Sequence, residues 1–204
     1  MNLKLITATL LLSPVTFIIM LIVFVTSCLA LWKRKFFAAL ILHPFSVTHE
    51  REYYRLFTSD LVHNDKLHLL LNVFVLYAFC SDLEEYLRKH STSGSWLFLV
   101  IYIAAMLTSA IITTIRHRKD FNYSTSGASG SIMGCMFSLM LINPKGTGLE
   151  LAFVGSVKNV YSGLLYIIFL ILFQLRRGEV NYEVHFWGAI GGIVATLIIY
   201  PGIL

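Results

Sequence analysis

Long uncharged runs of apolar residues alternate with short clusters of charged residues along most of the chain. Residues 5–32 carry no charge and are followed by Lys33-Arg34-Lys35, and residues 96–115 are closed by Arg116. Because a helix needs roughly 20 apolar residues to cross a bilayer, these runs indicate membrane spans. The pattern predicts six of them, at residues 6–32, 67–86, 96–115, 127–143, 157–175 and 184–201.

The segment between the first two predicted spans has a different pattern. Residues 36–47 are apolar but include Pro44, and this stretch is too short to cross a membrane. We interpret residues 33–66 as a long first loop that is partly embedded in the bilayer. The predicted fold class is therefore all-α: one polytopic membrane domain over residues 1–204, with six transmembrane helices in a bundle.

The composition narrows the class of protein further. Of the 204 residues, 57% are hydrophobic and 13% are charged, with a mean hydropathy of +0.74, which excludes a soluble globular enzyme. The net charge of +5 comes from basic residues between apolar runs, so it indicates membrane topology and argues against nucleic-acid binding. Cys28, Cys80 and Cys135 show no CxxC or Cys/His spacing, and we expect no metal site and no cofactor.

Four polar residues in the predicted spans are the candidates for chemistry: His68, Asn72, Ser129 and His185. A polar group in hydrocarbon is unfavourable unless it is paired or faces a cavity. His68 and Asn72 are four residues apart and share one face of a helix. The second, fourth and sixth spans run in the same direction, and each candidate lies near the start of its span. We therefore expect all four on one side of the membrane, at similar depth.

Glycine pairs are spaced to bring two of these helices together. The chain contains two GxxxG patterns, Gly130 with Gly134 and Gly188 with Gly192. Small residues at this spacing permit close backbone approach between membrane helices. The first pair follows Ser129 directly, and the second shares a helix face with His185. The pattern predicts that Ser129 and His185 come within hydrogen-bond reach.

A serine and a histidine in this arrangement suggest nucleophilic catalysis. A serine hydroxyl becomes a nucleophile when a base takes its proton, and neutral imidazole is the usual base near pH 7. We assign Ser129 as nucleophile and His185 as general base. The uncharged runs supply no acidic residue to lie beside His185, which favours a two-residue dyad. His68, Asn72 and the backbone N–H of Ser129 are the expected donors to a developing oxyanion.

Each of these residues also has a purely structural interpretation. Ser129 taken alone fits a small residue in a helix contact, and His185 fits a ring at the level of the lipid headgroups. His68 and Asn72 fit an interhelical hydrogen bond that specifies packing. The joint pattern on three parallel helices favours catalysis.

Several motifs together resemble the rhomboid family of intramembrane serine proteases, in the same order and over most of the chain. They are Glu52-Tyr53-Tyr54-Arg55-Leu56-Phe57-Thr58, His63, His68-Leu69-Leu70-Leu71-Asn72, Glu84, Gly127-Ala128-Ser129-Gly130 with Gly134, and His185-Phe186-Trp187-Gly188 with Gly192. The resemblance implies a six-helix core with Ser129 and His185 as the catalytic dyad. It also implies that His68 and Asn72 form the oxyanion site.

The resemblance further implies a substrate and a route to the site. The substrate would be the transmembrane helix of a single-pass membrane protein, which enters sideways from the membrane lipid through a gate at residues 157–183. Arg55 would brace the first loop. Met133 stands where the family usually has an aromatic ring that packs on the histidine, and a thioether makes a weaker contact there.

The resemblance and the basic residues disagree about orientation. The first, third and fifth loops contain 11 Lys and Arg residues, namely Lys33, Arg34, Lys35, Arg51, Arg55, Lys66, Arg116, Arg118, Lys119, Arg176 and Arg177. The other face has 4, namely Lys4, Arg88, Lys89 and Lys145. The positive-inside rule places the active-site face toward the cytoplasm. The resemblance implies the opposite, and we expect that face outside the cytoplasm, in the plasma membrane.

Two other functions remain open at this level. A non-proteolytic rhomboid-like protein that binds membrane-protein clients needs the fold without the dyad, so the presence of both Ser129 and His185 argues against it. A small transporter or channel is typically marked by discontinuous helices and paired intramembrane charges, which are not evident. The sequence also lacks the HExxH pattern of zinc proteases and a pair of aspartates inside the spans. Nothing in it assigns an oligomeric state.

Overall fold

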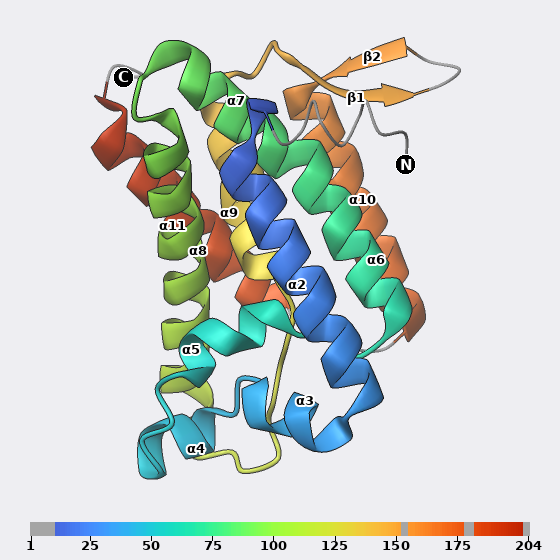
Figure 1. The fold of residues 1–204 in the computed structure, drawn as a ribbon, viewed down its shortest axis with the longest axis vertical. Helices are drawn as coiled ribbons and strands as arrows, with labels where there is room; N and C mark the ends of the chain where they lie inside the picture. Colours follow the sequence, from blue (N-terminus) through green and yellow to red (C-terminus); the bar gives the residue numbers. More distant parts are fainter. Residues whose placement is uncertain (1–10, 152–154, 178–181, 202–204) are drawn as a thin grey trace.

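The computed structural model describes residues 11–151, 155–177 and 182–201, which form a bundle of long helices standing side by side (Figure 1). The bundle consists of α2 (Pro14–Trp32), a continuous run of α6 (Lys66–Val75), η2 (Leu76–Cys80) and α7 (Ser81–His90), then α8 (Gly94–His117), α9 (Ser129–Ile142), α10 (Asn159–Arg177) and α11 (Tyr182–Ile199). The predicted all-α fold class is confirmed. Residues 6–10 of the first predicted span lie outside the described residues.

Four of these helical stretches are long and apolar enough to cross a membrane. They are α2, the run Lys66–His90, α8 and α11. These four stretches, in a chain with so few charges, make the protein an integral membrane protein. The apolar helices Ser129–Ile142 and Asn159–Phe169 are shorter.

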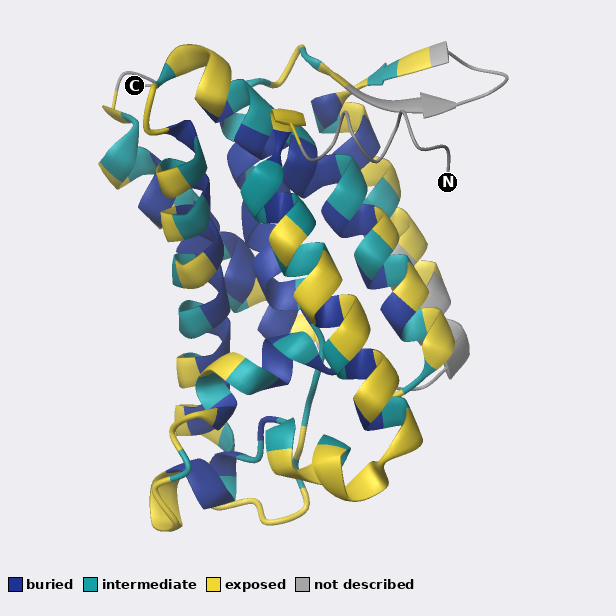
Figure 2. Ribbon diagram, viewed as in Figure 1, coloured by how far each residue is buried: buried dark blue, intermediate teal, exposed yellow. Residues whose placement is uncertain are grey.

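Helix α9 is short and lies in the middle of the bundle. Its 14 residues rise about 21 Å, against roughly 30 Å for the hydrocarbon core of a bilayer. Nearly all of its length is buried (Figure 2), and a helix that is apolar on all sides belongs in a protein interior. Ser129, the first residue of α9, therefore lies inside the bundle, and the longer helices extend past it toward the first loop.

The first loop folds into short helices at one end of the bundle, α3 (Arg34–Leu40), α4 (Pro44–His49), α5 (Arg55–Thr58) and η1 (Ser59–Leu61) (Figure 1). Arg55, the first residue of α5, is buried among them. Its guanidinium donates to the carbonyl oxygens of Ala38 and Ile41, both at 2.8 Å, and pairs with Glu52. The two carbonyls lie at the end of α3, where helices leave acceptors unpaired. Arg55 thus braces the loop.

The far end of the second helical run differs from the sequence-based prediction. The predicted span ends at residue 86, whereas the helix continues to His90, and Glu84 within it is completely buried. Its carboxylate accepts hydrogen bonds of 2.6 to 3.1 Å from the backbone N–H groups of Val15 and Thr16 and the hydroxyls of Thr16 and Ser95. Glu84 therefore caps the start of α2, where the helix dipole favours negative charge.

A β-hairpin that the sequence pattern does not predict joins α9 to α10. Strand β1 (Thr147–Leu151) pairs antiparallel with β2 (Gly155–Lys158), and Thr147 lies opposite Lys158. The hairpin lies at the end of the bundle opposite the first loop (Figure 1). It is a small element in one connection and forms no part of the helical core.

Candidate active site

Helices α9 and α11 touch through their glycines. A Cβ atom on Gly188 would lie 2.1 Å from the carbonyl oxygen of Gly130, and one on Gly192 would lie 2.3 Å from that of Gly134. Neither place has room for a side chain, so the two backbones are in direct contact. The two helix faces that carry the GxxxG patterns are therefore the faces that meet.

Ser129 and His185 lie at the same end of this contact. Ser129 directly precedes Gly130, and His185 stands one turn before Gly188. Ser129 is partly exposed, whereas His185 is buried. Within the described ranges no hydrogen bond joins the two side chains. Catalytic hydrogen bonds are often longer before a substrate binds and tighten in the complex.

The His68 ring lies against the backbone that leads into α9. Gly127 has a φ of +114°, a left-handed conformation that favours glycine. A Cβ atom there would also lie 2.8 Å from Cε1 of His68 and 3.0 Å from its Nε2. The structure thus places the His68 ring against Gly127, which lies two residues before Ser129 in the chain.

The proton on His68 is set by Asn64. His68 Nδ1 lies 2.8 Å from Asn64 Oδ1, and an amide oxygen can only accept. Nδ1 therefore carries the proton, and in a neutral ring Nε2 presents a lone pair. Donation from Nε2 requires a second proton or a reversed Asn64 amide, whose NH2 group would donate to Nδ1. The predicted oxyanion role of His68 depends on this proton.

Asn72 is buried one turn after His68. Its Nδ2 donates to the carbonyl oxygen of His68 at 2.9 Å. Within the described residues its Oδ1 has no hydrogen-bond partner, and the second N–H of the amide is not used in that bond. Of the two side-chain donors proposed for an oxyanion, Asn72 is the one that can donate without a change of protonation.

His63 supports the segment before the serine. Its Nδ1 lies 2.9 Å from Ser27 Oγ, and its Nε2 lies 3.4 Å from the backbone nitrogen of Ala128. Because Ser27 Oγ donates to the carbonyl of Leu61, His63 Nδ1 must be the donor to Ser27, and Nε2 accepts from Ala128. Burial, with the nearby His68, lowers the pKa of His63 to about 3, so this ring stays neutral.

Asp60 is a buried carboxyl group that the sequence analysis missed. It lies in η1 and accepts hydrogen bonds of 2.5 Å from the hydroxyls of Ser131 on α9 and Tyr102 on α8. Burial raises the pKa of Asp60 to about 6, and the two hydrogen bonds oppose that rise. Its position in a loop carries no signal of burial, because loop residues are usually exposed.

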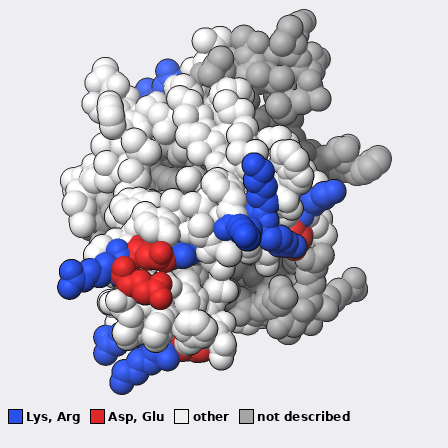
Figure 3. Space-filling model, turned by 60° about the horizontal axis from the view of Figure 1, so that its bottom comes forward, with Lys and Arg blue, Asp and Glu red and all other residues white. Residues whose placement is uncertain are grey.

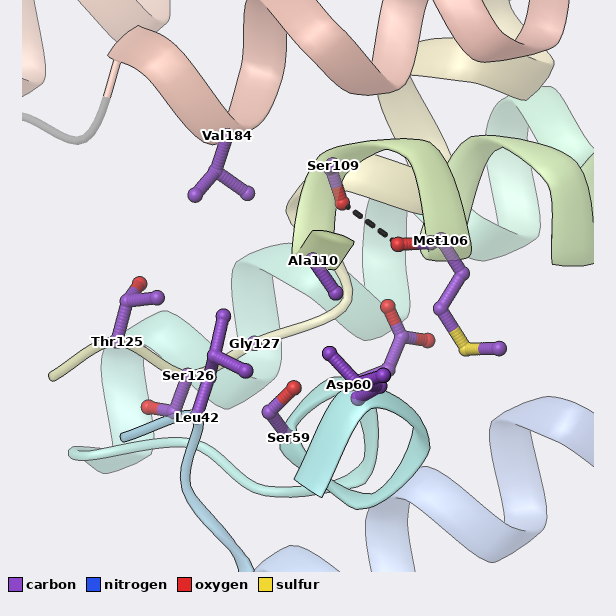
Figure 4. A pocket seen from close by; sticks show the side chains of 11 residues that line it. Leu42, Ser59, Asp60, Met106, Ser109, Ala110, Thr125, Ser126, Gly127 and Val184 are labelled. Atoms are coloured by element: carbon purple, nitrogen blue, oxygen red, sulfur yellow. Dashed lines mark hydrogen bonds between the residues drawn. The ribbon is translucent and has the colours of Figure 1, made fainter. Parts of the chain in front are cut away.

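A small cavity lies beside the serine segment, between the first loop, α8 and the start of α11 (Figure 4). Val184 lines it from α11, and Gly127 lines it from the α9 entry segment. These two residues are close neighbours of His185 and Ser129 in the chain. Ser59 and Asp60 add polar groups from the first loop. The cavity is therefore next to the predicted dyad.

The start of α11 is tied to the end of α8 by an ion pair and a hydrogen bond. Glu183, two residues before His185, lies 2.8 Å from Arg116 Nε and 3.0 Å from His117 Nε2. The His117 ring stacks on Tyr123, with 3.7 Å between the ring centroids. These contacts join three segments that flank the site.

The arrangement brings a hydroxyl, imidazoles and a buried amide to one end of the bundle, which is the set of groups needed for acyl transfer. Within the described residues, no group of three or more His, Cys, Asp or Glu is placed to hold a metal ion. Ser129 heads α9, whose first N–H groups have no partner within the helix. Arg55, His63 and Asp60 hold the surrounding backbone.

Comparison with known proteins indicates the family of this chain. The chain is 28% identical over 151 residues to the Rhomboid protease GluP of Bacillus subtilis, an overlap of 74% of this chain and 27% of that protein. It is 26% identical over 154 residues to Rhomboid-like protein 15 of Arabidopsis thaliana, an overlap of 73% of this chain and 37% of that protein. The chain thus spans well under half the length of either relative.

A family model described as the Rhomboid domain matches residues 50–202. The match begins before α5 and includes α6 through α11, so it contains all four polar candidates of the predicted site. It covers most of the chain. The protein belongs to the rhomboid family.

Proposed function

We propose that this protein is an intramembrane serine endopeptidase that cleaves transmembrane helices of other membrane proteins with Ser129 and His185. The observation that supports this most strongly is the glycine contact between α9 and α11, which has Ser129 and His185 at one end. A helix contact that served packing alone would not need a hydroxyl and an imidazole at the same level. Membership of a family whose members include a named rhomboid protease supports the same reading.

In the proposed reaction, His185 takes the proton of Ser129 Oγ as this oxygen attacks the scissile carbonyl carbon. The imidazolium then gives that proton to the leaving amide nitrogen, which leaves an acyl ester on Ser129. Water attacks the ester by the same route, with His185 again as base, and restores the hydroxyl. Every step is transfer of an acyl group or a proton, and none requires a cofactor.

The negative charge that forms on the carbonyl oxygen needs donors already in place. The backbone N–H of Ser129 at the start of α9 and the free N–H of Asn72 are the two that we propose. A single such donor typically contributes on the order of 100-fold or more to the rate. His68 adds a third when Nε2 carries a proton.

The position of Ser129 suggests what kind of substrate fits. Because Ser129 lies inside the bundle at the head of a short central helix, the scissile bond must reach it within the thickness of the membrane. A peptide bond in a helix is tied by i to i−4 hydrogen bonds, so a transmembrane substrate has to unwind locally. We propose the transmembrane segment of a single-pass protein, and no nucleic acid, as the partner.

The proposed route to the site passes α10. This helix lies at the edge of the bundle, and large apolar side chains such as Leu165 and Phe169 face outward from it. The gate suggested by the family resemblance covers residues 157–183, of which residues 178–181 lie outside the described ranges. Displacement of α10 would open α9 to a helix arriving from the lipid.

For orientation we propose the plasma membrane, with the active-site end of the bundle outside the cytoplasm. The resemblance supports this placement, and the excess of Lys and Arg at that end opposes it. A single cysteine introduced at exposed Tyr53, probed with a membrane-impermeant maleimide on intact cells, decides the matter. Labelling of intact cells is expected, and labelling only after lysis contradicts the proposed side.

Cleavage of a generic single-pass reporter by the purified protein in liposomes tests the proposed activity. Ser129→Ala and His185→Ala are expected to abolish cleavage while the protein remains folded. Matched controls are Ser124→Ala, an exposed serine in the α8–α9 connection, and His90→Ala, an exposed histidine at the other end of the bundle. Both controls should cleave at the wild-type rate.

A fluorophosphonate probe that reacts with activated serines gives a readout that does not depend on the reporter. The wild-type protein is expected to react, and Ser129→Ala is expected not to. Equal labelling of wild type and Ser129→Ala, or normal cleavage by either dyad variant, would show that another residue is the nucleophile or base.

A further inference from the structure

Helix α3 is unusual because none of its residues is buried. It starts directly after α2, which ends at Trp32, and runs across the end of the bundle (Figure 1). Trp32 is 79% exposed, and Phe36 is also exposed. A helix with exposed aromatic and basic side chains, at the end of a membrane span, belongs at the boundary between acyl chains and headgroups.

Three consecutive cations stand where α2 turns into α3. Lys33, Arg34 and Lys35 are all exposed. The ion pairs that the described residues form involve none of them. Lys33 Nζ lies 5.4 Å from the centroid of the Trp32 ring, and the guanidinium of Arg34 lies 5.8 Å from that of Phe37. Lys33 and Arg34 therefore lie over aromatic rings, and none of the three charges is compensated by an acidic residue among the described residues.

These charges lie at headgroup level because α2 fixes their depth. The apolar span Pro14–Trp32 ends one residue before the first cation. Figure 3, which looks onto this end of the molecule, shows the charged side chains gathered in compact groups with uncharged surface around them. A cationic group beside exposed aromatic residues, at the depth of lipid headgroups, fits the surface of an anionic leaflet.

We infer that Lys33, Arg34 and Lys35 form a binding surface for anionic phospholipid headgroups. Each cation near an anionic membrane surface favours association by roughly fivefold. Three acting together enrich anionic lipid at α3 by up to on the order of 100-fold. The inference concerns headgroup charge, and it is tested with lipids of defined charge.

The surface is connected to the predicted active site through the first loop. Arg55 donates to the carbonyls of Ala38 and Ile41 at the end of α3, and Thr58 Oγ1 donates to the carbonyl of Leu40. The residue after Thr58 is Ser59, whose carbonyl accepts from the backbone N–H of Gly127, two residues before Ser129. A lipid that holds α3 in place therefore steadies the segment that carries Ser129.

Binding is tested on the full-length protein by native mass spectrometry, with a mixture of phosphatidylglycerol and phosphatidylcholine as the lipid probe. The wild-type protein should retain phosphatidylglycerol in preference. Lys33→Gln, Arg34→Gln and Lys35→Gln combined should lose at least fivefold of that preference. The matched control combines Lys89→Gln and Lys145→Gln, two exposed lysines at the other end of the bundle and outside the proposed gate.

Equal retention of phosphatidylglycerol by the α3 variant and the control variant, or no preference in the wild type, overturns the inference. A melting temperature equal to that of the wild type shows that the α3 variant is folded. The preference should also weaken at high salt, because exposed charges are screened. A preference that salt does not change would mean that headgroup charge is not what is recognised.

The effect on catalysis rests on the proposed function and is measured separately. Reporter cleavage should be faster in vesicles that contain phosphatidylglycerol than in pure phosphatidylcholine, and the α3 variant should lose this response while the control keeps it. If the wild-type protein cleaves the reporter at the same rate in both kinds of vesicle, the proposed coupling between lipid binding and catalysis is overturned. Absence of cleavage in every vesicle counts against the proposed protease, and the binding result is then judged by mass spectrometry alone.

Discussion

Ser131 Oγ donates a 2.5 Å hydrogen bond to Asp60 Oδ1, and the pair joins the first loop to α9 two residues beyond Ser129. Asp60 Oδ2 accepts a second hydrogen bond from Tyr102 on α8. One buried carboxyl group therefore fixes three segments around the predicted nucleophile. It acts on the position of Ser129 and contacts no reacting atom in the proposed mechanism.

Removing this carboxyl group should harm activity more than replacing it with an amide. Asp60→Ala leaves the hydroxyls of Ser131 and Tyr102 without their acceptor, and each unpaired buried group destabilises by roughly 1 to 3 kcal/mol. Asp60→Asn keeps one carbonyl oxygen as an acceptor, and its NH2 group can donate a hydrogen bond to the other hydroxyl oxygen. We expect strongly reduced reporter cleavage and a lower melting temperature for the alanine variant only. Equal behaviour of the two variants would contradict a role in hydrogen bonding.

The same group should make stability depend on pH. Burial raises the pKa of Asp60 from 3.8 to about 6, so between these values the folded protein binds more protons than the unfolded chain. The free energy of unfolding then falls as pH rises through this window, by roughly 3 kcal/mol, and is constant on either side. Asp60→Asn lacks this contribution. The wild-type minus variant difference, from reversible unfolding in detergent at several pH values, should fall between pH 4 and 6, and a flat difference would refute the shift.

A methyl group at the α9–α11 contact should disrupt the site. Gly188→Ala places Cβ 2.1 Å from the backbone oxygen of Gly130, which cannot yield without separating the helices. A displacement of about 1 Å between catalytic groups can lower the rate on the order of 100-fold. Gly94→Ala is the control, because its Cβ would also meet backbone, 2.3 Å from the nitrogen of Arg88, but at the end of the bundle opposite the dyad. The control should cleave at the wild-type rate, and comparable losses in both variants would point to general destabilisation.

Glu84 offers a test of stability away from the site. Glu84→Gln puts an NH2 group against donors at the start of α2, including the backbone N–H of Val15 or Thr16, and should destabilise by roughly 1 to 3 kcal/mol. Glu85→Gln alters its neighbour, which makes a partly exposed ion pair worth at most about 1 kcal/mol. Thermal unfolding of the two variants separates them. A Glu84→Gln melting temperature no lower than that of Glu85→Gln would contradict the cap.

The contacts of Glu183 at the start of α11 should affect turnover more than folding. Glu183→Gln removes the ion pair with Arg116 and keeps an acceptor for His117. Because these side chains are partly exposed, the stability loss should stay below about 1 kcal/mol. Because Glu183 is two residues from His185, we expect kcat to fall by less than about tenfold at nearly constant KM. Glu85→Gln serves again as the control. A change confined to KM would assign Glu183 to substrate binding.

Much of this architecture is predictable from sequence because a membrane leaves few solutions. Every backbone polar group of a span must be satisfied within it, so an uncharged run such as residues 96–115 has to be helical. The same physics singles out Ser129 and His185, since polar groups are rare in such runs. The spacing of the glycines then indicates which helix faces can meet.

The features that sequence reasoning missed arise from contacts between distant segments. Asp60 is buried because the first loop folds beneath α9, and Glu84 is buried because α2 begins beside it. Neither residue lies in a pattern that distinguishes it from an exposed acid. The hairpin of β1 and β2 pairs too few residues to produce a clear alternation of apolar and polar positions.

Helix α2 supplies partners to two buried groups of the matched region. Ser27 accepts from His63, and Thr16 donates to Glu84, although both lie before residue 50, where the family match begins. A chain trimmed to the matched residues would deprive the His63 N–H of its acceptor and would leave the Glu84 carboxylate with the Ser95 hydroxyl in place of four donors. The part of this protein that similarity detects is therefore smaller than the part that must fold together, and a boundary for truncation or domain exchange belongs before Pro14.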